Sequence, residues 1–326
     1  MEAFPELSKL MSVIENAPDF ARVNLLTRVE MKGHEFPIYS LVIGTEKKEA
    51  PTLGLFGGVH GLERIGSQCV LAFLESLFEQ LRWDAELRRD FENCRIVSIP
   101  IINPAGMYFG RRSNPNGVDL MRNSPVSAQK EPAFLLGGHR YGPFLPWYRG
   151  PEGAEMEKET RAVIDFVAKE TFESSACILL DVHSGFGIKD RLWYPFAKTS
   201  DRFPSMDQVD ALVEILNRSY PNHVYLVEPQ SLSYTTHGDL WDHVFELHYE
   251  KYKGKKLFMP WTLEMGSWIW VKKNPFQLIS EGGMFNPVKE HRYKRTLRRH
   301  MPLFNFLMRA VRNQNTWWVR ERENSL

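Results

Sequence analysis

The 326-residue sequence predicts an α/β fold in which helices cover a β-sheet. Between residues 52 and 102, apolar runs of strand length flank a segment of helical periodicity, as in a βαβ unit. Hydrophobic residues make up 43% of the chain and charged residues 25%, which is sufficient for a large core. No internal repeat, low-complexity segment or change in composition divides the chain. We therefore expect one domain over residues 1–326.

The individual elements follow from periodicity and from turn residues. Residues 103–155 are rich in Gly, Pro, Asn and Arg and predict a long loop, which in a compact domain is usually functional. Its part 125–155 could be a lid or a packed surface loop. The helices are expected at 1–20, 64–81, 156–169, 205–218 and about 290–313, the last being basic and amphipathic with a solvated charged face. The strands are expected as two within 22–46, then 52–57, 95–102, 177–182, 223–228 and 257–265.

Charge and cysteine content restrict the class of protein. Lys and Arg number 41 and Asp and Glu 40, a net charge of +1 that gives no reason to expect a nucleic-acid or membrane partner. No uninterrupted apolar run approaches the roughly 18 residues of a membrane span. The N-terminus lacks a basic region followed by an apolar run, so we expect no secretory signal and a cytoplasmic location. Three cysteines predict buried free thiols rather than a disulfide framework: Cys69, Cys94 and Cys177.

The ends of two predicted strands carry residues that bind metals. Strand 52–57 leads into Gly-Val-His60-Gly-Leu-Glu63, at the edge where open α/β sheets bind ligands. An imidazole and a carboxylate three residues apart can hold one metal ion, or can cap the following helix. His183 follows the strand 177–182 and could be a third ligand or a structural histidine. Two nitrogens and one carboxylate are typical of a catalytic zinc with one open position.

Three further residues predict hydrolytic chemistry. Glu264, at the end of strand 257–265, could take a proton from a zinc-bound water and return it to the leaving group, or could be a surface carboxylate. Arg112 and Arg122 lie in the long loop. One guanidinium could polarise a scissile carbonyl, and the other could hold a substrate carboxylate in a bidentate fork.

Taken in order, these motifs resemble those of the zinc metallocarboxypeptidase family, which includes carboxypeptidases A and B. The resemblance spans about residues 50–270 and implies a single α/β domain with a mixed, twisted sheet. It implies one zinc per chain. The matching motifs are His60-x-x-Glu63, Asn103-Pro-x-Gly106, the run from Arg112 to Asn123, His183-Ser184, and Glu264 on the last strand.

The resemblance also assigns a role to each matching residue. Zinc would be held by His60, Glu63 and His183, Arg112 would polarise the carbonyl, Arg122 would bind the terminal carboxylate, and Glu264 would be the general base. Tyr234 would cover the substrate carboxylate, and Trp241, seven residues further on, would line the specificity pocket, with Asp239 or Asp242 as alternatives at that position. Asn123 and Ser184 complete the expected substrate-binding set.

One position departs from the family pattern. Met121 replaces the asparagine that usually precedes Arg122, which removes a hydrogen bond to a charged group worth on the order of 1.5–3 kcal/mol. Arg111 could serve in its place. The expected substrate is a peptide or an acyl-amino acid with a free carboxylate.

The expected activity is that of a metallocarboxypeptidase. The alternatives are a zinc-dependent deacylase or amidohydrolase acting on N-acyl amino acids or on γ-glutamyl or murein peptides, and a non-catalytic metal-binding module. The module is disfavoured because no ligand or base is missing. A second metal held by His237, His243 or Asp181 also stays open.

Overall fold

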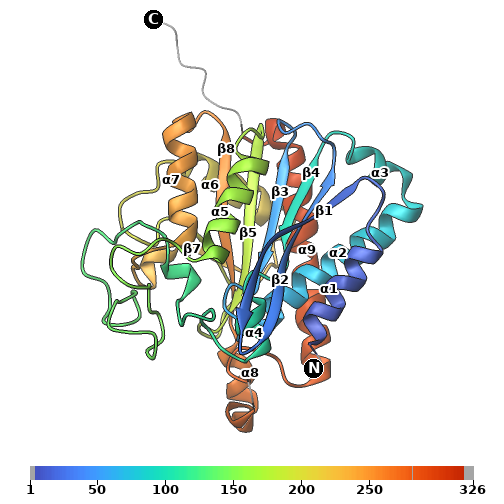
Figure 1. The fold of residues 1–326 in the computed structure, drawn as a ribbon. Helices are drawn as coiled ribbons and strands as arrows, with labels where there is room; N and C mark the ends of the chain where they lie inside the picture. The colour runs from blue at the N-terminus through green and yellow to red at the C-terminus, as the bar shows by residue number, and fades with distance from the viewer. Residues whose placement is uncertain (1–3, 281, 319–326) are drawn as a thin grey trace, which may run out of the picture.

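Eight strands form one mixed sheet in the computed structural model, which describes residues 4–280 and 282–318 (Figure 1). Their order across the sheet is β1-β2-β4-β3-β5-β8-β6-β7. The central strands β4, β3, β5 and β8 are parallel, whereas β2 and β6 run antiparallel to their central neighbours. The strands are β1 Ala21–Met31, β2 His34–Gly44, β3 Thr52–Gly57, β4 Arg95–Ile99, β5 Ala176–Ser184, β6 Arg191–Tyr194, β7 Leu226–Pro229 and β8 Leu257–Met265.

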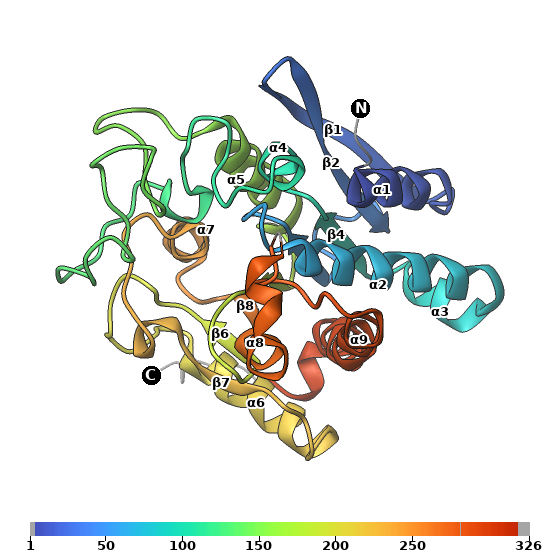
Figure 2. The same ribbon diagram turned by 90° about the horizontal axis from the view of Figure 1, so that it is seen from below.

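Helices cover both faces of this sheet (Figure 2). The helices α2 and α9 pack against each other and against β3 and β5 on one face, and α5 and α7 pack on the other. No helix of the described residues is long and apolar enough to cross a membrane. The α-helices are α1 Pro5–Glu15, α2 Arg64–Trp83, α3 Ala85–Asp90, α4 Pro104–Tyr108, α5 Lys158–Thr171, α6 Met206–Ser219, α7 Leu240–Tyr252, α8 Trp268–Lys273 and α9 Glu290–Arg312.

The burial of the central strands explains their sequences. Every residue of β3, β5 and β8 is buried, because helices cover both faces of the parallel part of the sheet. Such strands have continuous apolar runs rather than alternating patterns. The three cysteines are buried and free, as predicted. The mixed, helix-covered sheet is confirmed.

Most of the predicted elements are present with boundaries that differ by a few residues, but several were missed. The predicted strand 95–102 ends at Ile99, and the loop 103–155 contains α4 and the 3-10 helix Leu120–Arg122. Sequence analysis missed α7, although Asp239 caps it by accepting hydrogen bonds from the amides of Trp241 and Asp242. The other missed elements are α3, α8 and the strand β6.

The register of the central strands brings distant residues to one edge of the sheet. In the β5–β8 ladder His183 pairs with Glu264, and β3 ends beside Val182 of β5. The first turn of α2 lies unusually close to β5. A Cβ atom added at Gly66 would lie only 2.1 Å from the Val182 carbonyl oxygen, which is too close for any side chain. Only glycine permits this approach, which carries the start of α2 towards His183.

Candidate active site

Three buried residues at the carboxyl edge of the sheet form a candidate metal site. His60 lies in the turn after β3, Glu63 immediately precedes α2, and His183 is in the last part of β5. One ligand atom from each lies within 4.8 Å of the others. The Nδ1 atoms of His60 and His183 lie 2.8 and 3.0 Å from the two carboxylate oxygens of Glu63. The structure thus brings together the three residues expected to bind zinc.

Carboxylates behind the two histidines fix their orientation. The Nε2 atom of His60 lies 3.1 Å from Asp119 Oδ1, and that of His183 lies 2.7 Å from Asp181 Oδ2. A metal-binding histidine usually donates its other N–H to such a partner, which leaves Nδ1 free to bind the ion. Arg112 Nη2 also lies 2.8 Å from His60 Nε2, but only the contact with Asp119 is compatible with a proton on that nitrogen. Two imidazole nitrogens and one carboxylate, each imidazole backed by a carboxylate, fit zinc.

The charges of these groups support one another. Burial opposes the ionisation of Glu63, yet the neighbouring His60 and His183 hold its pKa well below the usual range. Burial also opposes the positive charge of His183, but Asp181 and Glu63 outweigh it and raise the pKa of His183. A cation bound between these groups would further favour the ionised form of Glu63 and the neutral form of His183.

Glu264 faces the same site from the neighbouring strand. Its Oε1 accepts a hydrogen bond of 3.0 Å from the amide of Phe186. Burial, followed by the negative charge of Glu63, raises the pKa of Glu264 to about 8. A cation bound by Glu63 would oppose the second cause and favour the ionised carboxylate that a general base requires.

Two arginines enter the site from the long loop. Arg112 Nε donates to Asp119 Oδ2 at 2.8 Å, and its Nη1 donates to Glu63 Oε1 at 3.3 Å. Arg122 is buried, and its Nε has no hydrogen-bond partner among the residues that the structure describes. Its guanidinium carbon lies 6.0 Å from the centre of the Tyr234 ring. Burial raises the pKa of Tyr234, so its phenol stays neutral and able to donate.

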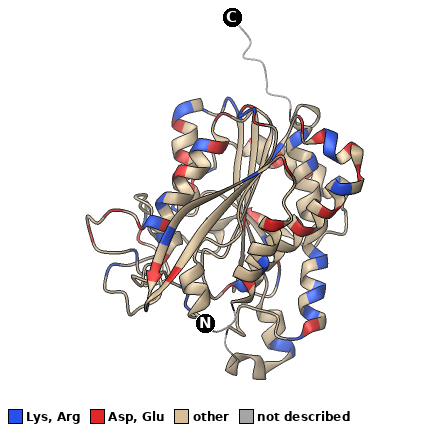
Figure 3. Cartoon of the chain, turned by 45° about the vertical axis from the view of Figure 1, so that its right-hand side comes forward, with Lys and Arg blue, Asp and Glu red and all other residues tan. Residues whose placement is uncertain are grey.

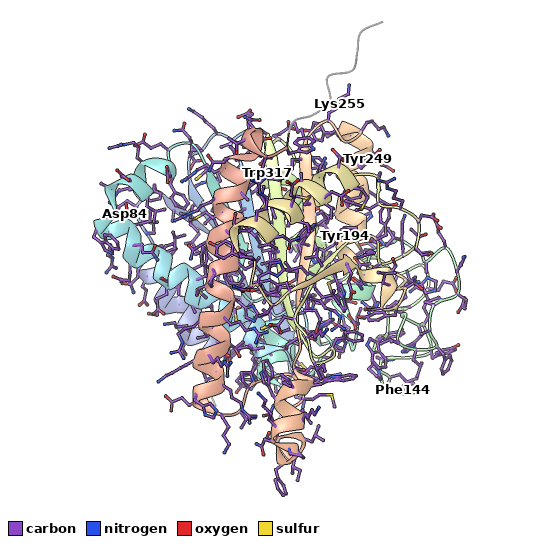
Figure 4. The ribbon with its side chains drawn as sticks, turned by 180° about the vertical axis from the view of Figure 1, so that it is seen from behind. Asp84, Phe144, Tyr194, Tyr249, Lys255 and Trp317 are labelled. Carbon is purple, nitrogen blue, oxygen red and sulfur yellow. The ribbon has the colours of Figure 1, made fainter. Side chains whose placement is uncertain are left out.

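A cavity of about 530 Å³ connects these groups. Its charged or titratable lining residues are His60, Glu63, Arg112, Arg122, His183, Glu264 and Tyr234. Most of the remaining wall is apolar or aromatic and includes Met121, Leu136, Pro146, Trp147, Phe186, Trp193, Trp268, Met284 and Phe285. Segment 125–155 therefore contributes one wall through Leu136, Pro146 and Trp147. Phe144 of that segment lies at the surface instead, as Figure 4 shows.

A comparison with protein families assigns this arrangement. Residues 28–257, more than half of the chain, match the model of the family described as zinc carboxypeptidase. The chain belongs to the zinc carboxypeptidase family. Glu264 lies just beyond the matched range, and its place in the site follows from its pairing with His183.

Several members of this family resemble the chain in sequence or in structure. The carboxypeptidase N catalytic chain of Rattus norvegicus is 30% identical over 215 residues, which are 60% of this chain and 44% of the relative. Carboxypeptidase M of Mus musculus is 25% identical over 209 residues, which are 60% of this chain and 39% of the relative. The chain thus spans less than half the length of these relatives.

Solved structures with low identity share the fold. Bovine thrombin-activatable fibrinolysis inhibitor, solved with a tick carboxypeptidase inhibitor, superposes with a TM-score of 0.66 at 18% identity, covering 94% of this chain and 95% of that one. The carboxypeptidase A of Helicoverpa armigera superposes with a TM-score of 0.67 at 16% identity, and the match covers 96% of this chain and 74% of that one. At these identities the likeness supports the fold alone.

Some residues expected to bind substrate lie elsewhere in this family member. Trp241 is buried in the core, packs on Phe56 with ring centres 5.0 Å apart and donates to Asp181 at 2.9 Å. It is not among the residues that line the cavity, so the expectation that it lines a specificity pocket is corrected. The reason is that position 241 belongs to α7, whose inner face packs on the sheet.

Asn123, Arg111 and Ser184 also differ from a simple substrate-binding set. The amide of Asn123 bonds the backbone of Arg149 and Glu157, and so holds the loop. Neither Asn123 nor Arg111 is among the residues that line the cavity. Ser184 does line the cavity, but its hydroxyl donates to the Phe285 carbonyl at 2.7 Å.

The structure adds residues that sequence analysis did not assign. Asp119 supports both His60 and Arg112, and Asp181 supports His183. In the described ranges 4–280 and 282–318, no other cluster of metal-binding residues occurs, and His237 accepts a hydrogen bond from the amide of Ala128. The spacing Asp-x-His in a strand was a usable signal, because residues two apart point to the same face.

Proposed function

We propose that this chain is a zinc-dependent metallocarboxypeptidase that hydrolyses the C-terminal peptide bond of its substrate. The observation that supports this most is the cavity shared by the metal-binding residues, by Glu264 and by Arg122, a buried guanidinium whose Nε has no partner in the described structure. A cation held in this way is suited to bind the terminal carboxylate of a substrate in a bidentate fork.

The residues of the chain divide the chemistry among them. A zinc ion held by His60, Glu63 and His183 would supply Lewis acidity, lowering the pKa of water and polarising the scissile carbonyl. Glu264 takes the proton of the attacking water and delivers it to the nitrogen of the leaving amino acid. Arg112 donates hydrogen bonds to the carbonyl oxygen as negative charge develops there.

Arg122 and Tyr234 orient the substrate. Arg122 holds the terminal carboxylate, and the neutral phenol of Tyr234 beside it donates a further hydrogen bond. Met121 lines the cavity next to Arg122 in place of the usual asparagine. The hydrogen bonds to the terminal carboxylate therefore come from Arg122 and Tyr234 without a further amide donor. The aromatic wall excludes water, which strengthens these charged interactions.

The wall also determines which C-terminal side chain fits. Among the described residues, Glu63 and Glu264 are the carboxylates that line the cavity, and both have roles at the reacting centre. A C-terminal Lys or Arg side chain would therefore be buried without a counter-charge, which is costly. We expect a preference for large apolar or aromatic C-terminal residues.

The proposal is tested with N-blocked dipeptides that end in Phe or Lys, with the same peptides amidated at the C-terminus, and with N-acetyl amino acids. Release of free Phe from the unmodified dipeptide, with little from the other substrates, is expected. Faster hydrolysis of the N-acetyl amino acids would show that the chain is a deacylase and not a carboxypeptidase.

Two finer points belong to the same proposal. One zinc per chain is expected, and elemental analysis of the wild type and of His183→Ala checks it. The cytoplasmic location stays a prediction that cell fractionation would test.

A further inference from the structure

The segment 268–299 is strongly basic, although the whole chain is nearly neutral. It comprises α8, the 3-10 helix Pro275–Ile279 and the first turns of α9. Eight of the 41 Lys and Arg residues lie in it, but only two of the 40 Asp and Glu residues. The segment therefore carries a formal charge of +6 and the rest of the chain −5. Figure 3 shows basic residues along the first half of α9.

The same segment exposes large apolar side chains. It includes the projection at the lower end of the molecule in Figure 1, where α8 is labelled. In the 3-10 helix after α8, Phe276 is 80% exposed, Ile279 85% and Leu278 53%. Three neighbouring exposed apolar residues on a projection are unlike the scattered ones that any surface carries, and indicate a binding surface.

Basic side chains of α8 and α9 share a cavity, which Asp190 also lines. Lys273 at the end of α8 and Arg292, Arg295 and Arg299 of α9 line one cavity of about 250 Å³. Arg299 is paired with Asp190 at 2.7 Å. For the other three, no carboxylate among the described residues lies within the 4.0 Å of a salt bridge, and Arg292 donates a hydrogen bond to the Trp270 carbonyl at 3.1 Å.

We propose that the segment 268–299 docks on an anionic lipid surface. Exposed Phe, Leu and Ile side chains flanked by Lys and Arg are typical of proteins that bind at the membrane interface, where the apolar groups enter the acyl boundary and the cations meet lipid phosphates. A nucleic acid would use the cations but leave the apolar tip in water. A second copy of the chain would bring two faces of like charge together, which is unfavourable.

Docking in this way has a geometric consequence for the active site. Trp268, Met284 and Phe285 of the same segment line the active-site cavity. The cavity therefore lies beside the proposed lipid-binding surface. The inference itself does not depend on the proposed peptidase activity, because binding to lipid is measured without a substrate.

Co-sedimentation with phosphatidylcholine vesicles, with and without phosphatidylserine, tests the inference on the full chain. The wild type should sediment with the anionic vesicles only, and added salt should release it by screening. Each Lys near an anionic surface contributes about 1 kcal/mol, or roughly fivefold in partitioning, so Lys272→Gln with Lys273→Gln should weaken binding about 25-fold. Phe276→Ser with Ile279→Ser should weaken it by at least about tenfold.

A matched control is Trp83→Ser. Trp83 is 74% exposed but precedes Asp84, which Figure 4 places on another part of the molecule, away from α8. The Trp83→Ser variant should bind anionic vesicles as strongly as the wild type does. Equal binding to neutral vesicles, or none to either kind, would overturn the inference. So would a dimer in sedimentation velocity that Phe276→Ser with Ile279→Ser dissociates, because a second copy would then be the partner.

Discussion

Replacing Arg122 by glutamine should remove the preference for a free terminal carboxylate. Arg122 is 2% exposed, so its charge is little screened by solvent. Two charge-assisted hydrogen bonds to a carboxylate, at about 1.5–3 kcal/mol each, amount to about 3–6 kcal/mol. At 1.4 kcal/mol for each factor of ten, kcat/KM for the acid should fall by about 10²- to 10⁴-fold.

The assay compares an N-blocked dipeptide with its C-terminal amide. The amide cannot use the full charge of Arg122, so its slow hydrolysis should change little and the ratio of the two rates should approach one. For Arg122→Lys this ratio should lie between those of the wild type and of Arg122→Gln, because lysine keeps the positive charge but cannot form a bidentate pair with a carboxylate.

The matched control is Arg111→Gln, which removes a guanidinium of the same long loop that does not line the cavity. It should leave the ratio unchanged. If Arg122→Gln keeps the full preference for the acid, or if Arg111→Gln abolishes it, the assigned role of Arg122 is wrong. Thermal unfolding of each variant separates a loss of fold from a loss of binding.

Three further predictions concern the base, a positioning residue and a buried carboxyl group. Glu264→Gln should lower kcat by about 10²- to 10⁴-fold with unchanged zinc content; a parallel loss of zinc would argue against its role as base. Asp181→Asn should weaken zinc binding by about 10- to 100-fold, measured by chelator competition, because His183 loses its carboxylate partner. Burial raises the pKa of Glu159 from 4.5 to about 7, so its contribution to stability is present below pH 4.5 and is lost as the pH rises through 7. Glu159→Gln should therefore stabilise the fold by about 3 kcal/mol at pH 8 and hardly at pH 4, and equal unfolding temperatures of variant and wild type at pH 8 would contradict this.

The parts of the fold that the sequence predicts best are those where burial dominates. The strands β3, β5 and β8 are apolar throughout, and β8 was predicted with its observed bounds. The four residues of β6 are too few to show a period. Their pairing with β8 depends on the tertiary structure, as does the burial that makes Trp193 part of the cavity wall.

In the candidate site, too, some residues could be predicted from the sequence, whereas others depend on the tertiary structure. His60, Glu63 and His183 could be chosen because each follows or ends a strand, and strand ends meet at one edge. Trp241 was misplaced because counting seven residues from Tyr234 ignores the helix that begins in between. Asp239 at its cap was the overlooked signal. The support of His60 by Asp119, 59 residues away, depends on the path of the loop, which periodicity does not describe.

The pairing of His183 with Glu264 affects how such a protein can change over time. The two residues are opposite each other on adjacent parallel strands, whose spacing of about 4.8 Å is set by backbone hydrogen bonds. The cavity wall around them comes largely from separate segments, including 125–155 and 268–288. Insertions and substitutions in those segments can therefore alter substrate choice while the separation between ligand and base stays constant. For an engineer, these segments are the places to diversify, and the β5–β8 ladder is the part to leave intact.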